Sequence, residues 1–420
     1  MKTDLRFALL PQASQDIVRQ LSRVPILLQC KASHRHVHKT YTNPRGELSA
    51  QSGPPITVRF ERTSWVVKQQ TSRVAVALDI GVTEAEGVRA PIGELKLELQ
   101  TGEAGALYAV ARQISQTVSL LPLRGSKLER GCQLVLQTQP AALHAVPVDL
   151  TAQMSLAQVA AATLQEMFLQ FTVNLLHLRE ADDPELLHQA RIGWRRFKSA
   201  LQLFKKHAVL PTPPERAPLQ PLWRAMTDLR DLEVAQAHTL PMFANAYTGG
   251  DGARKQQWQA MDQALANAVA RQRTQVLDAL EAPAVGTNLI EWTQWLVLQL
   301  PVEPPDIAMR PALVGAWLRE RMLRLHKQLL QEPANANDPA VQHRIRILSK
   351  RLRYCVEALR PLLPKGRAKR WLQLATSLQE NIGAVRDIAC AVEIVGTLDV
   401  EAGIVQFLRG VAFGQRMHTR

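Results

Sequence analysis

Alternating large apolar and polar residues dominate the first third of the chain. The pattern is clearest over residues 56–61, 74–79 and 94–99. Because side chains alternate between the two faces of a strand, it predicts strands with one face buried and the other in water. Between Ala104 and about Thr117 the apolar residues recur at helical spacing instead. The first part is therefore predicted to be an α+β fold with one interrupting helix.

From residue 155 onward the strand-like alternation disappears. Long windows with a period near 3.6 are separated by proline-bearing gaps at 211–214 and 301–305, which predicts an all-helical region. The stretch 137–147 between the two parts holds two prolines and no charged residue. We therefore expect two domains, residues 1–145 and residues 150–420.

Two helical windows carry the same set of basic positions. The first copy comprises His188, Arg191, Arg195, Arg196 and Lys198, and the second, 155 residues later, comprises His343, Arg346, Lys350, Arg351 and Arg353. An Arg-Asp element also recurs, as Arg230-Asp231 and Arg386-Asp387 at an offset of 156. The helical domain is therefore predicted to be internally duplicated, with halves of about 155–285 and 309–420.

Helical spacing places His188, Arg191, Arg195 and Lys198 along one stripe. Trp194, with Phe197 and Leu201, falls on a separate apolar stripe that can pack on neighbouring helices. Like charges at these spacings destabilise a helix by about 0.2–0.5 kcal/mol per pair. A solvated basic face is one reading of this pattern. Repetition in register favours anion binding, because solubility constrains only the net charge.

Composition agrees with an anionic partner. The 420 residues are 46% hydrophobic and 21% charged, as in a globular protein, and 51 Lys and Arg against 37 Asp and Glu give a formal charge of +14. The four cysteines lie far apart and form neither a zinc motif nor a disulfide framework. With no signal peptide or membrane-length apolar segment in the sequence, we expect a cytoplasmic protein with no membrane partner.

The duplicated motif, His-x-x-Arg-x-x-x-Arg-Arg-x-Arg/Lys, resembles that of the CHAD domain, the conserved-histidine α-helical domain. The similarity covers about 155–420, and Lys350 replaces an arginine in the second copy. This resemblance implies a pair of four-helix bundles about a pseudo-twofold axis, with the basic helices lining a central positive groove. It also implies a ligand, inorganic polyphosphate, and a possible place in the cell, the polyphosphate granule.

Arginine suits such a ligand because its planar fork binds phosphate oxygens bidentately and stays charged at cellular pH. Nucleic acid is a less favoured partner, because no aromatic platforms interleave with the basic positions: Trp194 and Phe197 lie on the apolar stripe. The expected polyphosphate-binding residues are His188, Arg191, Arg195, Arg196, Lys198, Lys205, Arg230, His343, Arg346, Lys350, Arg351, Arg353 and Arg386.

The first 140 residues resemble a CYTH domain, the antiparallel β-tunnel of the triphosphate tunnel metalloenzymes, chiefly over 93–99 and 126–131. Active members hold a divalent metal with acidic residues of an opening Glu-x-Glu-x-Lys strand and a later Glu-x-Glu strand. Here Lys2, Thr42 and Lys96 replace three of the expected acids, although Asp4 remains. The candidate phosphate-holding residues of the tunnel are Arg6, Arg59, Lys127 and Arg130.

The missing acids lead us to expect a domain that binds phosphate without catalysis, and hence no cofactor. The alternative is a tripolyphosphatase that uses Mg²⁺ or Mn²⁺. His34, His36 and His38 alternate along one segment, but no carboxylate or cysteine lies beside them in sequence, which favours a solvated edge strand or loop over a metal site. Asp182 and Asp183 precede Pro184 and are predicted to stabilise the start of the next helix.

Overall fold

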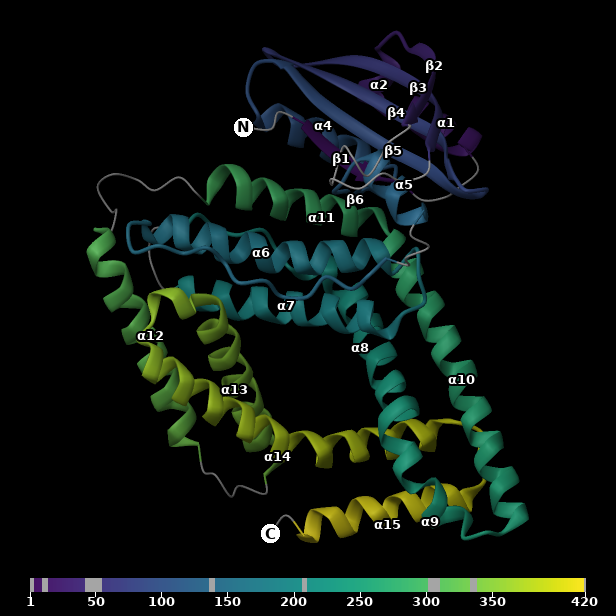
Figure 1. Ribbon diagram of the computed structural model, residues 1–420, viewed down its shortest axis with the longest axis vertical. Coiled ribbons are helices and arrows are strands. Elements are labelled where there is room, and N and C mark those ends of the chain that lie inside the picture. Colours follow the sequence, from purple (N-terminus) through teal and green to yellow (C-terminus); the bar gives the residue numbers. More distant parts are fainter. Residues whose placement is uncertain are drawn as a thin grey trace.

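The computed structural model describes residues 4–9, 14–41, 55–135, 140–205, 210–300, 310–332 and 338–418. An antiparallel sheet with its helices forms one end of the molecule, and a frame of long helices forms the rest (Figure 1). This two-part architecture was predicted from the change of periodicity near residue 150.

Six strands form the sheet, in the order β2-β3-β4-β5-β1-β6, and every neighbouring pair is antiparallel. The strands are β1 (Asp4–Ala8), β2 (Ser33–Tyr41), β3 (Ile56–Gln69), β4 (Ser72–Ala85), β5 (Val88–Thr101) and β6 (Leu121–Pro122). The three segments predicted from alternation lie within β3, β4 and β5, and thus form the middle of the sheet.

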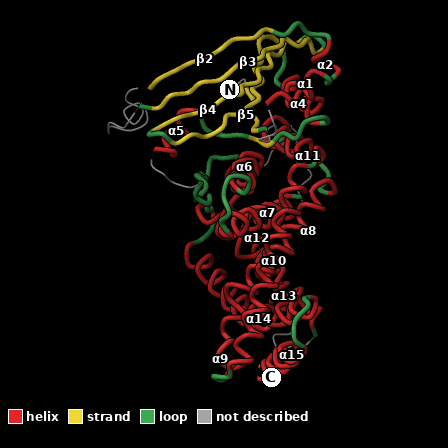
Figure 2. The backbone as a smooth tube through the Cα atoms, turned by 90° about the vertical axis from the view of Figure 1, so that its right-hand side faces the viewer, coloured by secondary structure: helices red, strands yellow, loops and turns green. Residues whose placement is uncertain are grey.

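The two faces of the sheet differ in the way the alternation requires. Leu95 and Leu97 of β5 point into a core with α4 (Gly105–Ser115), and both side chains are fully buried. Glu94, Lys96 and Glu98 occupy the opposite face, since strand neighbours alternate. Helices α1 (Ser14–Ser22), α2 (Pro25–Leu28) and α4 pack in the core on the Leu95 face, whereas α5 (Lys127–Val135) packs through Leu128 on the other face. Figure 2 shows α5 well separated from α1, α2 and α4.

The expectation of a single helix in this part was wrong, because α1, α2 and α5 accompany α4. These helices have at most nine residues, so each shows only two turns or so of periodicity. Ile17 and Leu21 of α1 are buried in the core under the sheet, where tertiary packing stabilises the helix.

The helical region repeats with the predicted offset. Its helices are α6 (Leu156–His177), α7 (Pro184–Phe204), α8 (Gln220–Val234), α9 (Ala244–Thr248), α10 (Gly252–Glu281), α11 (Pro283–Gln294), α12 (Pro311–Gln331), α13 (Pro339–Leu359), α14 (Lys365–Thr397) and α15 (Ala402–His418). The starts of α6 and α12 are 155 residues apart, and so are both ends of α7 and α13.

The two basic helices begin in the same way. Asp183 caps α7 by accepting a hydrogen bond from the backbone N of Glu185 at 2.8 Å, and Asp338 caps α13 through Ala340 at the same distance. A proline follows each cap and pre-sets the first helical turn. The predicted capping role of Asp183 is confirmed, whereas Asp182 forms an ion pair with Arg273 at 2.7 Å.

The two halves share their hydrophobic cores. One cluster joins α6 and α7 to α12, α13 and the first half of α14, and it includes stacked rings of Phe204 and Trp317 with centroids 6.5 Å apart. A second cluster joins the distal ends of α8 and α10 to α14 and α15, through Trp258, Met261 and Ile404. The halves are thus held in a fixed relation, which matters because each contributes one basic helix.

Helix α11 connects the sheet to the frame, lying between α4 and α6 (Figure 1). A Cβ on Gly286 would lie 2.7 Å from the backbone oxygen of Leu120, so only glycine permits this close approach. The Ser115 and Thr287 hydroxyls form a hydrogen bond of 2.7 Å across the same contact. Across the described ranges, no helix has the length and apolar character needed to cross a membrane.

Candidate anion-binding site

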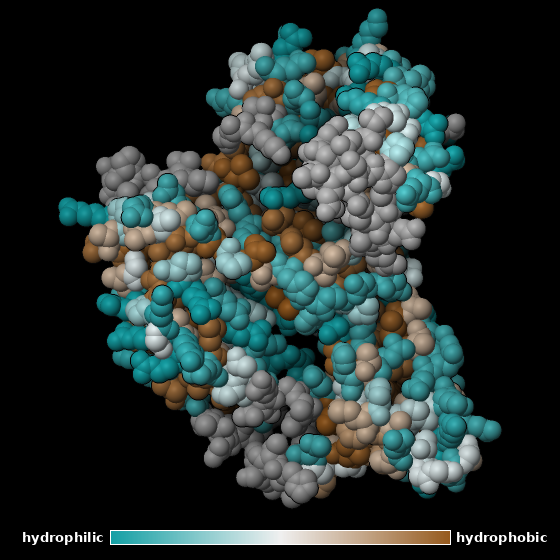
Figure 3. Space-filling model, viewed as in Figure 1, coloured by the Kyte–Doolittle hydropathy of each residue, from teal (hydrophilic) through white to brown (hydrophobic). Residues whose placement is uncertain are grey.

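Helices α7 and α13 pack against each other, while α8 packs against α7 and α14 against α13. These four helices surround the middle of the frame in Figure 1. In Figure 3 hydrophilic residues border a hollow at this place. The basic faces of both repeats can therefore line the same space.

The charges around Lys350 show that the basic faces of the two repeats lie close together. Its pKa falls from 10.5 to about 8, first because the side chain is largely removed from water and then because Arg195, Arg353 and Arg191 repel its charge. Arg191 and Arg195 belong to α7 and Lys350 to α13, so cations separated by 155 residues lie within one electrostatic neighbourhood. Asp387 only partly offsets this repulsion.

Arg191 is the most buried cation of the site, with 7% of its surface exposed. Its pKa is lowered to about 10, first by burial and then by the charges of Arg195, Arg230 and Arg386, while Asp231 opposes the shift. Its Nε and Nη1 atoms are buried without a hydrogen-bond partner. Buried donors are normally satisfied, so these two donor groups are available to an anionic acceptor.

Lys198 extends the basic surface along α7. Its pKa falls to about 8 because of burial and because Arg216, Arg195 and Arg191 repel its charge. The ammonium lies 4.3 Å from the ring centre of Trp223, and the guanidinium carbon of Arg191 lies 5.2 Å from the same ring. Cation–π attraction thus holds two neighbouring like charges in place.

The two residues of the first Arg-Asp element act on different partners. Arg230 bonds to Glu233 at 3.3 Å, and the charge of Asp231 acts on Arg191. Burial raises the pKa of Glu233 to about 7, although Arg230 opposes the shift. Arg386 is exposed on α14 and its charge reaches Arg191.

The two histidines of the motif differ. Burial, followed by the charge of Arg230, lowers the pKa of His188 to about 4, so this ring is neutral at pH 7 and adds no positive charge to the site. His343 is exposed near the start of α13. The duplication therefore preserves residue type at this position but not environment.

Arg196 is a correction to the predicted set. Only 3% of it is exposed, and its Nη2 lies 3.1 Å from Glu166 of α6, while Nη1 donates to Gln170. It therefore stabilises the contact between α6 and α7 and does not line the basic space. Its repeat partner Arg351 is half-buried on α13, and its charge acts on the fully buried thiol of Cys355.

The remaining predicted cations occupy the edges of the site. Arg353 repels Lys350 and pairs with Glu357 at 3.6 Å. Arg346 is half-buried on α13, and Lys205 is exposed at the end of α7. The structure thus brings Arg191, Arg195, Lys198 and Arg230 of one repeat together with Lys350, Arg353 and Arg386 of the other.

Two residues that contact or act on the site cations were not predicted. Trp223, on α8, contacts Arg191 and Lys198, and Arg216, in the segment before α8, acts on Lys198. Trp194 and Phe197 are buried as predicted. However, Trp223 places an aromatic ring among the cations, so the expectation of a basic surface without interleaved aromatics was wrong.

The candidate cations on the sheet have acidic partners. The Lys127 ammonium lies 2.8 Å from Asp79 and 2.9 Å from Glu94, whose side chains are 1% and 2% exposed. Burial acts to raise the pKa of Asp79, but hydrogen bonds from Arg62 and Lys127 outweigh it and the pKa is lowered. The prediction from sequence missed this buried pair of acids.

Arg6 and Arg59 are also paired. Arg6 lies 3.1 Å from Asp4, on the face that carries Lys127. Arg59 bonds to Glu84 and, by the strand alternation, lies on the opposite face, which separates it from the other three candidates. Lys2 and Thr42 lie outside the described residues, as does the side chain of Arg130 on α5.

His34, His36 and His38 are exposed on β2, an edge strand, which is the placement predicted for a solvated strand. His34 contacts the Thr63 hydroxyl at 3.1 Å. Within the described ranges, no three His, Cys, Asp or Glu side chains cluster in a way that could hold a metal ion.

Comparison with known families agrees with the duplicated helices. The family model of the CHAD domain matches residues 162–395, more than half of the chain. The chain belongs to the CHAD domain family. Among solved structures, the CHAD domain from the plant Ricinus communis is similar, with 27% sequence identity and a TM-score of 0.56; the match covers 66% of this chain and 92% of that one. The matched region contains the α7 and α13 basic faces, so the site lies within the CHAD domain.

Proposed function

We propose that the CHAD domain of this protein binds inorganic polyphosphate in the space between α7 and α13. The observation that carries the proposal is the mutual repulsion of Lys350 with Arg191 and Arg195, which joins the basic faces of both repeats. A polyanion with one negative charge per phosphate can contact cations of both repeats at once.

Hydrogen bonding supports the same ligand. Arg191 and Arg195 each have a buried donor without a partner, and arginine donors match phosphate oxygens. Each hydrogen bond to a charged group contributes about 1.5–3 kcal/mol. We expect no catalysis at this site. Retention at polyphosphate granules would follow from binding alone.

Titration of long-chain polyphosphate over a salt series tests the proposal. Affinity should fall steeply with salt, because neutralising several phosphates releases their counterions. Arg195→Ala with Lys350→Ala should weaken binding by about 100-fold or more while leaving the protein folded, since each 1.4 kcal/mol corresponds to a factor of ten.

A matched control removes the same charge elsewhere. Lys255 and Arg271 are exposed on α10, so Lys255→Ala with Arg271→Ala should leave binding within about twofold. Equal losses in the two double variants would mean that net charge alone drives binding. RNA at matched charge should bind more weakly than polyphosphate, and tighter RNA binding would identify the site as a nucleic-acid interface.

We further propose that the N-terminal part is a CYTH-like domain without triphosphatase activity. Support comes from Lys127, which occupies the space between Asp79 and Glu94 that a cation would otherwise take. We expect no appreciable release of phosphate from tripolyphosphate with Mg²⁺ or Mn²⁺ between neutral and alkaline pH. Robust turnover that Asp4→Ala abolishes would show that the domain is an enzyme.

A further inference from the structure

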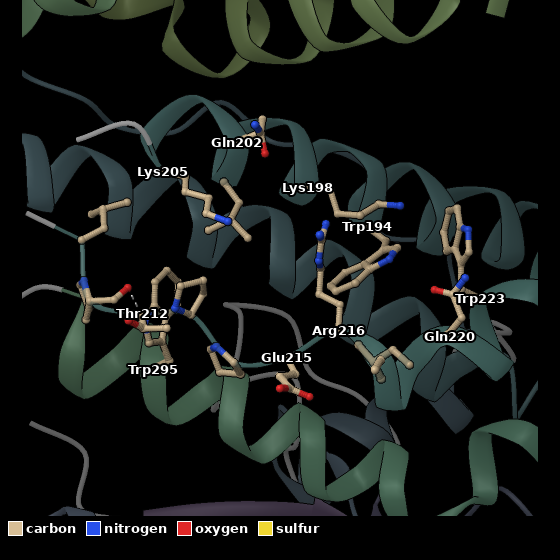
Figure 4. A pocket seen from close by; sticks show the side chains of 17 residues that line it. Trp194, Lys198, Gln202, Lys205, Thr212, Glu215, Arg216, Gln220, Trp223 and Trp295 are labelled. Atoms are coloured by element: carbon tan, nitrogen blue, oxygen red, sulfur yellow. Dashed lines mark hydrogen bonds between the residues drawn. The ribbon is translucent and has the colours of Figure 1, made fainter. Parts of the chain in front are cut away.

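A pocket of about 830 Å³ lies at one end of the basic surface. It is bounded by the C-terminal half of α7, the segment 210–219, the start of α8 and Trp295 (Figure 4). This volume lies in the range of small-molecule sites, about 300–1,000 Å³. The pocket is much too compact for a protein partner.

One end of the pocket is cationic. Lys198 and Arg216 approach each other there, and their mutual repulsion contributes to the low pKa of Lys198 (Figure 4). Glu215 is the one acidic side chain among the described lining residues, and in Figure 4 it lies away from Lys198. An anionic group placed between Lys198 and Arg216 would relieve this repulsion.

The other end is apolar. Trp295, which is 1% exposed, lies beneath it and positions Pro211, because its Nε1 donates to the backbone oxygen of Pro211 at 3.3 Å. Leu201 and Pro213 add to the apolar wall, and Thr212 provides a polar edge. A planar ring suits this apolar end of the pocket, because it buries apolar surface with little loss of conformational freedom.

We propose that this pocket binds a nucleotide, with the heterocycle against the half-buried Pro211 and Pro213 and the phosphates on Lys198 and Arg216. The Trp223 ring contacts both Lys198 and Arg191, so the phosphate tail would run toward the anion-binding site. Nucleotide and polyphosphate should then compete for Lys198. This competition rests on the function proposed above, whereas nucleotide binding does not.

Calorimetric titration of the full chain with ATP, tripolyphosphate and adenosine, without metal and at equal ionic strength, tests the pocket. ATP should bind about tenfold more tightly than tripolyphosphate, because only ATP fills the apolar end. Adenosine should bind more weakly than either. ATP affinity no greater than that of tripolyphosphate would overturn the proposal.

Variants separate the two ends. Arg216→Ala should weaken ATP and tripolyphosphate alike, whereas Thr212→Trp should fill the apolar end and remove only the preference for ATP. Gln202→Trp, on the exposed side of α7, provides a second filling variant should the first not fold. A preference for ATP that survives filling in a folded variant would also overturn the proposal.

Lys350→Ala distinguishes this proposal from the polyphosphate site. It should weaken polyphosphate and leave the preference for ATP over tripolyphosphate intact, because Lys350 does not line the pocket. Loss of the ATP preference in Lys350→Ala would place the nucleotide in the space between α7 and α13 and would overturn the proposal for the pocket. If polyphosphate does not bind while ATP does, only the function proposed above fails.

Discussion

Replacing Lys350 by methionine should stabilise the ligand-free protein and weaken polyphosphate binding. The positive charge of Lys350 is largely withdrawn from water and repelled by Arg195, Arg353 and Arg191, so the folded state disfavours it. Methionine keeps an unbranched side chain of similar length and removes the charge. A residue that served only to stabilise the fold would show the opposite change in stability.

The pKa shift sets the size of the effect. The pKa of Lys350 falls from 10.5 to about 8, and at about 1.4 kcal/mol per unit the charged form is disfavoured by at most about 3.5 kcal/mol. Lys350 remains partly exposed, so solvent screening reduces this to about 1–2 kcal/mol. For a region of this size the melting temperature should then rise by about 2–8 °C.

The pH dependence has a defined sign. Because the pKa of Lys350 is lower in the folded state, the unfolded chain holds the proton between about pH 8 and pH 10.5 when the folded chain has released it. Through Lys350, the free energy of unfolding of the wild type therefore increases as the pH rises from about 8 to 10.5. The advantage of Lys350→Met should be complete below pH 8 and shrink as the pH rises toward 10.5.

Thermal unfolding at pH 7 and pH 9.5, with and without polyphosphate, measures both effects. Without ligand, Lys350→Met should melt at higher temperature than wild type at pH 7, and polyphosphate should raise its melting temperature less. Lys327→Met, which removes an exposed charge on α12, should change neither quantity. A lower melting temperature at pH 7, or unchanged polyphosphate affinity, would refute the convergence of charges at Lys350.

Two further predictions concern Glu233 and the α6–α7 contact. Glu233→Gln should bind polyphosphate about three- to tenfold more tightly than wild type at pH 8, because it removes the charge that pairs with Arg230. At pH 6, where the Glu233 carboxyl is already protonated, the two proteins should bind about equally. The same affinity ratio at both pH values would contradict the Arg230–Glu233 pair. Gly193→Ala should lower the free energy of unfolding in urea by about 1–3 kcal/mol, because a Cβ would lie 2.7 Å from the backbone N of Phe171, whereas Gly366→Ala, which meets open space, should not.

Periodicity and duplication were enough to predict α7, α13 and the stripe they carry. The spacing of residues 188, 191, 195 and 198 fixes a common helix face, and the offset of 155 fixes the second copy. Arg196 shares the charge and the duplication but lies one position further around the helix. Whether that direction faces solvent or α6 depends on Glu166, thirty residues away, which no local pattern reveals.

Contacts between distant segments limited the rest of the prediction. Trp223 and Arg216 reach Lys198 from α8 and the segment before it, and neither belongs to a repeated motif. On the sheet, Lys127 lies on a helix that packs against strands more than thirty residues earlier, where it meets Asp79 and Glu94. Alternation predicts which residues share a face, but not which opposite charges meet across that face.

The duplication also explains why stability and binding oppose each other at this site. A single basic helix can spread its charges into water, but the shared core holds α7 and α13 together and forces their cations into one space. The repulsion is therefore built in by folding, and either loss of the Lys350 proton or an anion placed between the helices would relieve it. It follows that the affinity contributed by Lys350 includes the free energy regained from this repulsion, so the stability gained and the affinity lost in Lys350→Met have one origin.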